Sequence, residues 1–318
     1  MNRKITFGEA ITEALNEEFA RDDKIFIIGE EIRNINYRLL SEEFHKRFAH
    51  RIIVTPLIEE MLGSIGLGMS IGGLKPIITL SHGTFISLAF SDLYRIGAWR
   101  YRMGESSGPG IVFRVSYGGT GRGPEFDASF IAHLQHLPNL KIITPSSAYH
   151  AKGLLKTAIR HDGPVIFFEH KRLYDTTGEV PEEEYAIPFG SSSFLKKGGD
   201  ITVISWSFMA HKVEQAAPQL LKENIELEVI ALHTLHPLDF ESIKESAKKT
   251  ARVVIVEEDM LRGGVGAEIG ARIAEELPNC KINRVAAKNS PIGSGIYENY
   301  VLPTEEDIIQ ACKEIMDS

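Results

Sequence analysis

Two adjacent carboxylates, Glu59 and Glu60, precede an uncharged, glycine-rich segment that extends to Leu74. On spacing alone, the simpler interpretation is that both acids complement the positive end of a helix dipole. The alternative is that one of them is a buried functional carboxylate. Further along the chain, His82 could transfer protons in an active site, although a helix-start or core histidine is an equally good interpretation. Spacing by itself leaves both questions open.

Two glycine clusters could bind phosphate groups, but neither has the required spacing. Gly118–Gly123 follows a strand-like run and matches neither a Walker loop nor G-x-G-x-x-G. Gly263–Gly270 lies between a strand-like run and a helical segment, yet its glycines are also wrongly spaced. We predict a substrate-facing loop at the first cluster and no dinucleotide site at the second.

The surrounding pattern predicts the elements that position these residues. Runs rich in Val and Ile alternate with amphipathic segments along nearly the whole chain. Such runs are typical of strands buried on both faces of a parallel sheet, and the alternation indicates βαβ units. The predicted fold class is α/β with two doubly wound domains. Strands are predicted at 24–29, 51–56, 76–80, 110–116, 140–145, 164–170, 200–206, 226–232, 251–258 and 281–287, and helices at 10–22 and 148–162.

The helix that follows the 51–56 strand has its own start signal. Thr55 suits an N-cap and Pro56 suits the first helical position. Ser64, Gly68 and Gly72 then fall four residues apart on one face. A glycine costs about 1 kcal/mol in a helix interior, so a packing reason is expected. We predict that this face allows another helix to cross closely.

The alternating rhythm breaks once, in a stretch of turn residues and acidic residues after about residue 171. We therefore predict a first domain at 1–175, a linker at 176–197 and a second domain at 198–318.

Composition excludes several classes of protein. The chain has 318 residues, of which 43% are hydrophobic, and its net charge is −8. This charge argues against a nucleic-acid partner, and no uncharged apolar run reaches the length of a membrane span. The two cysteines, Cys280 and Cys312, form neither a metal-ligand pattern nor a disulfide framework. The opening residues lack the apolar region of a secretory signal, so we expect a cytoplasmic protein without membrane contact.

Several segments together resemble one known family. They include VTPLIEEMLGSIGLGMSIGGLKPI, LPNLKIITPSSAYHAKGLLKTAIRHDGPVIFFEHKRLY, EVIALHTLHPLD and EEDMLRGGVGAEI. In order and spacing they resemble the β subunit of the thiamine-diphosphate-dependent 2-oxo acid dehydrogenases, the decarboxylating component of the pyruvate and branched-chain complexes. The resemblance implies a transketolase-like pyrimidine-binding domain followed by a domain like the transketolase C-terminal domain.

The resemblance also implies roles for individual residues. Glu59 matches the glutamate that hydrogen-bonds a ring nitrogen of the cofactor's aminopyrimidine and thereby promotes activation of the thiazolium carbon. Phe85 matches an aromatic residue that packs against the same ring, although ordinary core packing is an alternative. Leu57 is expected to line the same pocket.

One family motif is missing from the chain. The superfamily holds the diphosphate through a divalent metal bound by Gly-Asp-Gly…Asn, and this sequence contains no Gly-Asp-Gly triplet. The resemblance therefore implies a separate α subunit that supplies this motif and binds Mg²⁺. Thiamine diphosphate would lie between the subunits of an α2β2 heterotetramer, and we predict no metal ligands in this chain.

A second departure concerns the family's catalytic histidine, because Phe126 occupies its position. His133 or His82 could replace it in the substrate pocket, or the partner chain could supply the acid–base groups. By default the chain belongs to an enzyme that decarboxylates a 2-oxo acid and transfers the acyl unit to a lipoyl group on an acyltransferase. The alternatives are a carboligase or split transketolase, which Phe126 favours, and a noncatalytic scaffold, which the presence of Glu59 disfavours.

Overall fold

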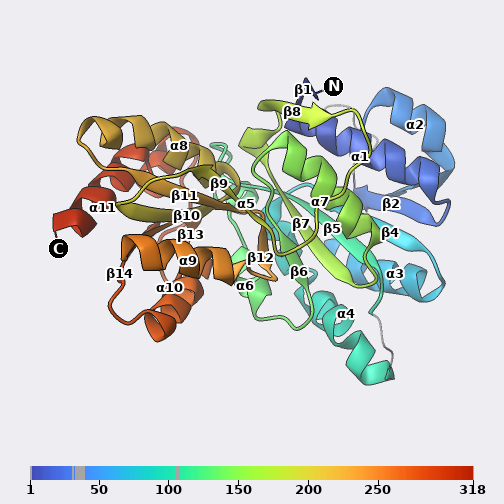
Figure 1. Ribbon diagram of the computed structural model, residues 1–318. Helices are drawn as coiled ribbons and strands as arrows, with labels where there is room; N and C mark the ends of the chain where they lie inside the picture. The colour runs from blue at the N-terminus through green and yellow to red at the C-terminus, as the bar shows by residue number, and fades with distance from the viewer. Residues whose placement is uncertain (1, 31, 33–39, 105–107, 318) are drawn as a thin grey trace.

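The computed structural model describes residues 2–30, 32, 40–104 and 108–317. Within this part of the chain, the strands form a seven-stranded sheet, a five-stranded sheet and a two-stranded ribbon. The two larger sheets lie in separate halves of the molecule that meet along a broad junction (Figure 1).

The larger sheet has the order β12-β6-β7-β5-β4-β2-β3, and its strands are parallel except β12, which is antiparallel to β6. Its central strands are buried along their whole length, which explains their near-continuous Val/Ile/Phe runs. The strands are β2 (Ile25–Glu30), β3 (Ile52–Thr55), β4 (Lys75–Leu80), β5 (Ile111–Tyr117), β6 (Lys141–Ile143), β7 (Pro164–His170) and β12 (Thr234–His236).

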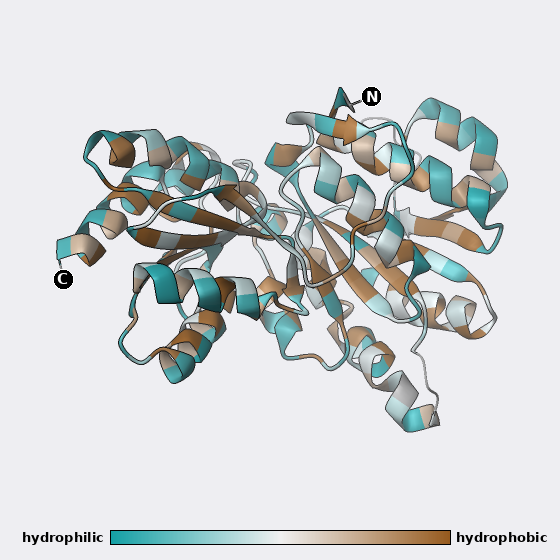
Figure 2. Cartoon of the chain, in the orientation of Figure 1, coloured by the Kyte–Doolittle hydropathy of each residue, from teal (hydrophilic) through white to brown (hydrophobic). Residues whose placement is uncertain are grey.

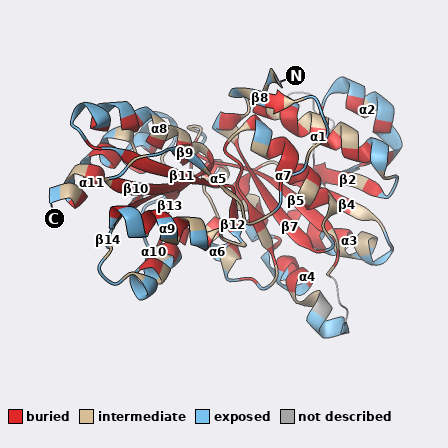
Figure 3. Cartoon of the chain, in the orientation of Figure 1, coloured by how far each residue is buried: buried red, intermediate tan, exposed pale blue. Residues whose placement is uncertain are grey.

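Helices cover both faces of this sheet, so the domain is doubly wound. One face packs against α1, α2 and α7, and the other against α3, α4 and α6. The buried residues lie mainly along the strands and the inner helix faces (Figure 3). The helices are α1 (Phe7–Arg21), α2 (Glu42–Phe48), α3 (Glu59–Ile71), α4 (Phe90–Met103), α5 (Pro124–Asp127), α6 (Ile131–Gln135) and α7 (Ala148–Arg160), with short 3₁₀ turns η1 (Ala49–Arg51), η2 (Gly83–Ser87) and η3 (Lys171–Leu173).

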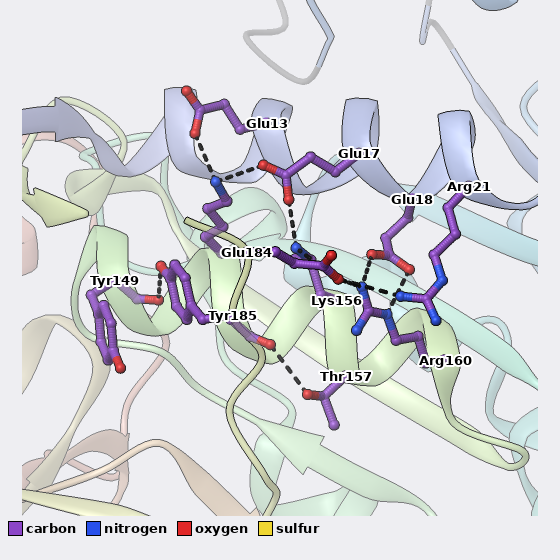
Figure 4. A network of polar contacts seen from close by, with 12 residues as sticks. Glu13, Glu17, Glu18, Arg21, Tyr149, Lys156, Thr157, Arg160, Glu184 and Tyr185 are labelled. Carbon is purple, nitrogen blue, oxygen red and sulfur yellow. Dashed lines mark hydrogen bonds and ion pairs between the residues drawn. The ribbon is translucent and has the colours of Figure 1, made fainter. Parts of the chain in front are cut away.

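Helices α1 and α7 are joined by a polar network as well as by apolar packing (Figure 4). The buried ammonium groups of Lys152 and Lys156 both pair with Glu17, at 2.7 and 2.5 Å. Arg160 forms two hydrogen bonds with the buried Glu18 carboxylate. These charges are paired, which is the condition under which buried lysines are tolerated.

The smaller sheet has the order β14-β13-β10-β11-β9, with only β9 antiparallel to its neighbour. Its central strands are strongly hydrophobic (Figure 2). Its elements are β9 (Ser192–Lys196), β10 (Ile201–Trp206), β11 (Leu227–Leu232), β13 (Arg252–Met260), β14 (Lys281–Ala287), α8 (Ser207–Lys222), α9 (Phe240–Thr250), α10 (Val265–Glu276), η4 (Gly295–Tyr300) and α11 (Glu305–Asp317).

The sequence predicted every strand of the α/β alternation to within a few residues, but it missed four. β1 (Asn2–Thr6) pairs with β8 (Thr177–Pro181), and β12 crosses from the second half of the chain to the edge of the first sheet. The predicted linker at 176–197 contains β8 and β9, and the proposed domain boundaries stay a prediction. No helix in the described residues is both long and apolar enough to cross a bilayer.

The predicted start of α3 was wrong. Thr55 is the last residue of β3, and the helix begins at Glu59 with Ile58 as its N-cap. The Ile58 amide donates instead to the Glu30 carboxylate, at 2.7 Å. The strand continues because Thr55 still pairs with Glu30 of β2, so sheet pairing overrides the local capping signal.

The predicted packing face of α3 is not the one where this chain packs most closely, and a close crossing by a helix of another chain stays a prediction. The closely packed glycines are Gly63 and Gly66, where an added Cβ would lie 2.5 Å from Asp92 Cβ and 2.6 Å from Ile78 Cδ1. By contrast, Gly68 faces open space. Ser64 donates to Asp92 of α4, but no other helix of the described residues closely approaches this face at Gly68.

The junction between the two halves contains a buried carboxylate that bonds across it. Glu258 of β13 accepts a hydrogen bond from the Gly119 amide at 2.6 Å and lies 2.6 Å from His170 Nε2, at the end of β7. Burial alone would raise the pKa of Glu258, but the His170 imidazole and the Gly119 amide hold it below its ordinary value.

Removing this carboxylate should destabilise the chain. We expect Glu258→Ala to lower the unfolding free energy by about 3 kcal/mol, because two buried polar groups lose their partner. Glu258→Gln should lose less, since its amide oxygen can still accept from Gly119. Urea unfolding measures both, with the exposed Glu245→Ala as the control. Equal midpoints for the Glu258→Ala and Glu245→Ala variants would contradict this assignment.

Candidate active site

The carboxyl ends of the parallel strands gather the candidate residues along one edge of the larger sheet. Glu59 follows β3, His82 follows β4, and the glycine loop Gly118–Gly123 follows β5. Ligands of open α/β sheets bind outside this edge, where neighbouring strands lead to helices on opposite faces. The topology therefore brings together residues that are widely separated in sequence.

Glu59 is the first residue of α3, and only 8% of its surface is exposed. Within the described residues, its carboxylate has no hydrogen-bond or ion-pair partner. The positive end of the helix dipole offsets part of the cost of burying this charge. A buried carboxylate that lacks a side-chain partner is available to a ligand, so the functional interpretation of Glu59 gains support over the dipole interpretation.

His82, Phe85 and Phe126 form an aromatic cluster beside this edge. The His82 ring centroid lies 4.7 Å from that of Phe126 and 5.2 Å from that of Phe85, and both contacts are edge-on. Phe85 and Phe126 are only partly buried. The fold thus brings three of the predicted site residues together.

The glycine loop is held by three buried carboxylates. Asp127 Oδ2 accepts from the backbone amides of Thr120, Arg122 and Gly123 at 3.1, 2.7 and 3.2 Å. Glu258 accepts from the Gly119 amide and Glu298 from the Gly121 amide, each at 2.6 Å. The amides that would be needed to cradle a phosphate are therefore already bonded within the chain.

Glycine is required at both ends of this loop. Gly118 and Gly123 each have φ of +97°, a conformation that side chains rarely adopt. An added Cβ would lie 2.1 Å from His170 Nε2 at Gly118 and 2.4 Å from Ser294 Oγ at Gly123. Gly118 and Gly123 are therefore explained by their backbone conformation and by close packing against His170 and Ser294.

Asp127 also fixes the position of Phe126. Lys171 Nζ donates to the Phe126 carbonyl at 2.5 Å and to Asp127 Oδ1 at 3.1 Å. Burial opposes ionisation of Asp127, but Thr120 and Lys171 hold its pKa below the ordinary value. Asp127 is fully buried, so the turn that carries Phe126 is anchored to an ionised carboxylate.

Two of the predicted site residues do not join the cluster. Leu57 is 73% exposed. His133 is exposed on α6 and contacts Phe130, with ring centroids 5.2 Å apart. The segment is not one continuous helix, because α5 ends at Asp127 and α6 begins at Ile131. His133 therefore does not lie two helical turns from Phe126.

The second glycine cluster is filled by the chain itself. Glu257 Oε1 accepts from the Gly266 amide at 3.0 Å, at the N-terminus of α10. An added Cβ on Gly264 would lie 2.7 Å from the same carboxylate. This is the position that a dinucleotide's diphosphate would take, so Glu257 accounts for these glycines without a nucleotide.

Glu257 should make stability depend on pH. Burial, with the nearby Asp259 charge, raises its pKa from 4.5 to about 8. A raised native pKa stabilises the fold fully below the unfolded value, and this stabilisation is lost as pH rises towards 8. The contribution of Glu257 to the unfolding free energy should then fall by about 1.4 kcal/mol per pH unit within that window.

Glu257→Gln should remove this slope and raise the melting temperature at pH 8, because the amide cannot ionise. Thermal unfolding between pH 5 and 8 tests this, with the exposed Glu275→Gln on the same helix as the control. A Glu257→Gln slope equal to that of the wild type would refute the assignment.

Comparison with known proteins supports these geometric observations. Residues 3–177 match the family model "Transketolase, pyrimidine binding domain", and residues 190–308 match "Transketolase, C-terminal domain". The chain is 37% identical to the pyruvate dehydrogenase E1 component subunit beta of Porphyra purpurea, with 99% of this chain and 98% of the relative covered. The chain belongs to the 2-oxo acid dehydrogenase E1 β-subunit family.

Other members of the E1 β family differ in their named substrates. The 2-oxoisovalerate dehydrogenase subunit beta of Bacillus subtilis is 34% identical, with 98% of this chain and 99% of the relative covered. The acetoin:2,6-dichlorophenolindophenol oxidoreductase subunit beta of Cupriavidus necator is 32% identical, with 99% and 98% covered. A solved "Split gene transketolase, inactive beta4 tetramer" shares the fold, with a TM-score of 0.83, 24% identity and 98% of each chain covered.

Family membership and fold confirm what the sequence predicted. What sequence reasoning missed is the contribution of the second half of this E1 β chain to the site. Glu258 and Glu298 hold the glycine loop from across the junction. The only signal for the first was an unusual run of three acids, Glu257–Asp259, at the end of a buried strand.

Proposed function

We propose that this chain is the β subunit of a thiamine-diphosphate-dependent enzyme that decarboxylates a 2-oxo acid and transfers the acyl unit. The observation that carries the proposal is the Glu59 carboxylate, which is buried at the ligand-binding edge without a partner among the described residues. Family membership supports the same conclusion.

The residues present fit one half of the cofactor. Glu59 would hold a proton shared with a ring nitrogen of the aminopyrimidine, and Phe85 would pack against that ring. When bound, thiamine diphosphate supplies the electron sink for decarboxylation. Leu57 would line the pocket from an exposed position, while Phe126 and His82 would face the substrate.

The other half of the cofactor finds no matching groups among the residues that the structure describes. Among the described residues, no group of three or more His, Cys, Asp or Glu side chains is arranged to hold a metal ion. The loop amides are bonded to carboxylates, and the sequence lacks Gly-Asp-Gly. An α subunit with the Gly-Asp-Gly…Asn motif would therefore bind Mg²⁺ and the diphosphate in a cytoplasmic α2β2 heterotetramer.

An exposed apolar surface next to Glu59 suits this partner. We define the α3–α4 surface as Leu57, Met61, Ile71, Leu88, Phe90 and Tyr94, all exposed. Gly68, on α3, faces open space, which would allow a partner helix to approach closely. Apolar residues gathered beside an incomplete site are typical of an interface that completes it.

The default acceptor is a lipoyl group on an acyltransferase. A second candidate is a carboligase or split transketolase-like enzyme, and Phe126 favours it because its ring cannot transfer a proton. Phe126→His separates the two. Lipoyl acylation gained by this variant would indicate that the native chain has a different acceptor, and acylation already present in the wild type would support the dehydrogenase.

Glu59→Gln should abolish turnover by the assembled complex while the chain still folds. The amide cannot share a proton with the cofactor, and general acid–base contributions are about 10²–10⁴-fold. Decarboxylation of pyruvate and 2-oxoisovalerate and the melting temperature are the readouts, with Glu60→Gln as the neighbouring control. Full activity of Glu59→Gln would leave a noncatalytic scaffold as the better interpretation.

Met61→Glu should weaken assembly, because it places a charge on the α3–α4 surface. Analytical ultracentrifugation with the α subunit measures the dissociation of the complex. Leu221→Glu, an equally exposed apolar position on α8, is the matched control. If Met61→Glu assembles like the wild type, the interface lies elsewhere.

A further inference from the structure

His82 is a buried imidazole among aromatic side chains. His82 follows β4 and is the N-cap residue of η2, but its side chain forms no capping hydrogen bond. Only 5% of its surface is exposed. Its ring contacts are with Phe85 and Phe126. These neighbours provide packing but no ordinary hydrogen-bond partner, so packing alone would be served better by an apolar residue.

One ring nitrogen is left unsatisfied. Nδ1 is enclosed and has no hydrogen-bond partner within the described part of the chain. Nε2 of the same ring is not enclosed in this way. Nε2 is therefore the ring nitrogen that a ligand can reach. A buried unpaired acceptor is tolerated better than a buried unpaired N–H, which favours the tautomer with its proton on Nε2.

The surrounding charges keep this ring neutral. Burial, together with the nearby Lys171 and Arg122 charges, lowers the pKa of His82 to about 4, while Asp127 opposes them. The Arg122 guanidinium lies over the Phe126 ring, 5.3 Å from its centroid. A neutral imidazole at physiological pH can donate a hydrogen bond without carrying a charge into the pocket.

We propose that the Nε2–H of His82 donates a hydrogen bond to the carbonyl oxygen of the 2-oxo acid. This inference rests on the proposed function and makes His82 a catalytic residue of that reaction. The hydrogen bond strengthens as negative charge develops on the oxygen, and no bond to His82 forms or breaks. The nearby Lys171 and Arg122 cations favour an anionic substrate.

Kinetics of the assembled complex separate this role from a structural one. We expect His82→Phe to lower kcat/KM for pyruvate or 2-oxoisovalerate by about 10²–10³-fold, the usual loss of one such donor. The affinity for thiamine diphosphate should not change. The melting temperature should rise, because the unpaired nitrogen is removed from an aromatic cluster. A purely structural histidine would not combine lower activity with higher stability.

Conservative variants test which ring nitrogen of His82 donates the hydrogen bond. His82→Gln can place an amide N–H near the position of Nε2 and should recover part of the lost activity, whereas His82→Asn should not. His50→Phe, at an exposed histidine, is the control for the substitution itself. Equal activity of the Gln and Asn variants would overturn the assignment to Nε2.

A binding measurement tests the contact between His82 and the substrate without relying on turnover. With ¹⁵N-histidine labelling of the full chain in the cofactor-free complex, pyruvate should shift the Nε2 resonance of His82 and leave that of His50 unchanged. An unshifted His82 resonance, or a His82→Phe variant with wild-type kcat/KM, would overturn the inference while leaving the Glu59 assignment intact. A wild-type complex that neither binds the cofactor nor turns over a 2-oxo acid would instead overturn the proposed function.

Discussion

The buried Asp127 carboxylate joins the parts of this site. It gathers three backbone amides of the glycine loop and the Lys171 ammonium, which also binds the Phe126 carbonyl. Charge-assisted hydrogen bonds of this kind are stronger than neutral ones and fix geometry as well as contributing energy. The placement of Phe126 against His82 therefore depends on a carboxylate that itself has no exposed atoms.

The second half of the chain completes this support. Glu258 and Glu298 bind the loop from across the junction, and Arg172 pairs with Glu298 beside it. The two halves are thus joined by directional bonds at the edge of the site as well as by the apolar core that they share. The second half of the chain consequently shapes the glycine loop of the first half.

Features with local signals were predictable from the sequence. The α/β alternation gave the strands, because continuous Val/Ile runs mark strands buried on both faces. Glu59 and Phe126 stood out through the resemblance to a known family, because spacing alone left the role of Glu59 open. Features decided by tertiary contacts were not predictable. β3 extends through Thr55 because β2 pairs with it, and the Glu257 carboxylate of β13 accepts a hydrogen bond at the N-terminus of α10. The position of His82 beside Phe126 depends on two segments whose residues are 44 positions apart, for which no local pattern exists.

The central claim is that this chain holds only the pyrimidine half of a thiamine diphosphate site. Titration calorimetry of thiamine diphosphate with Mg²⁺ tests it directly, first with the isolated chain and then with its complex with the α subunit. We predict weak binding, unaffected by Mg²⁺, to the isolated chain and tight Mg²⁺-dependent binding to the complex. Tight Mg²⁺-dependent binding to the isolated chain would contradict the account.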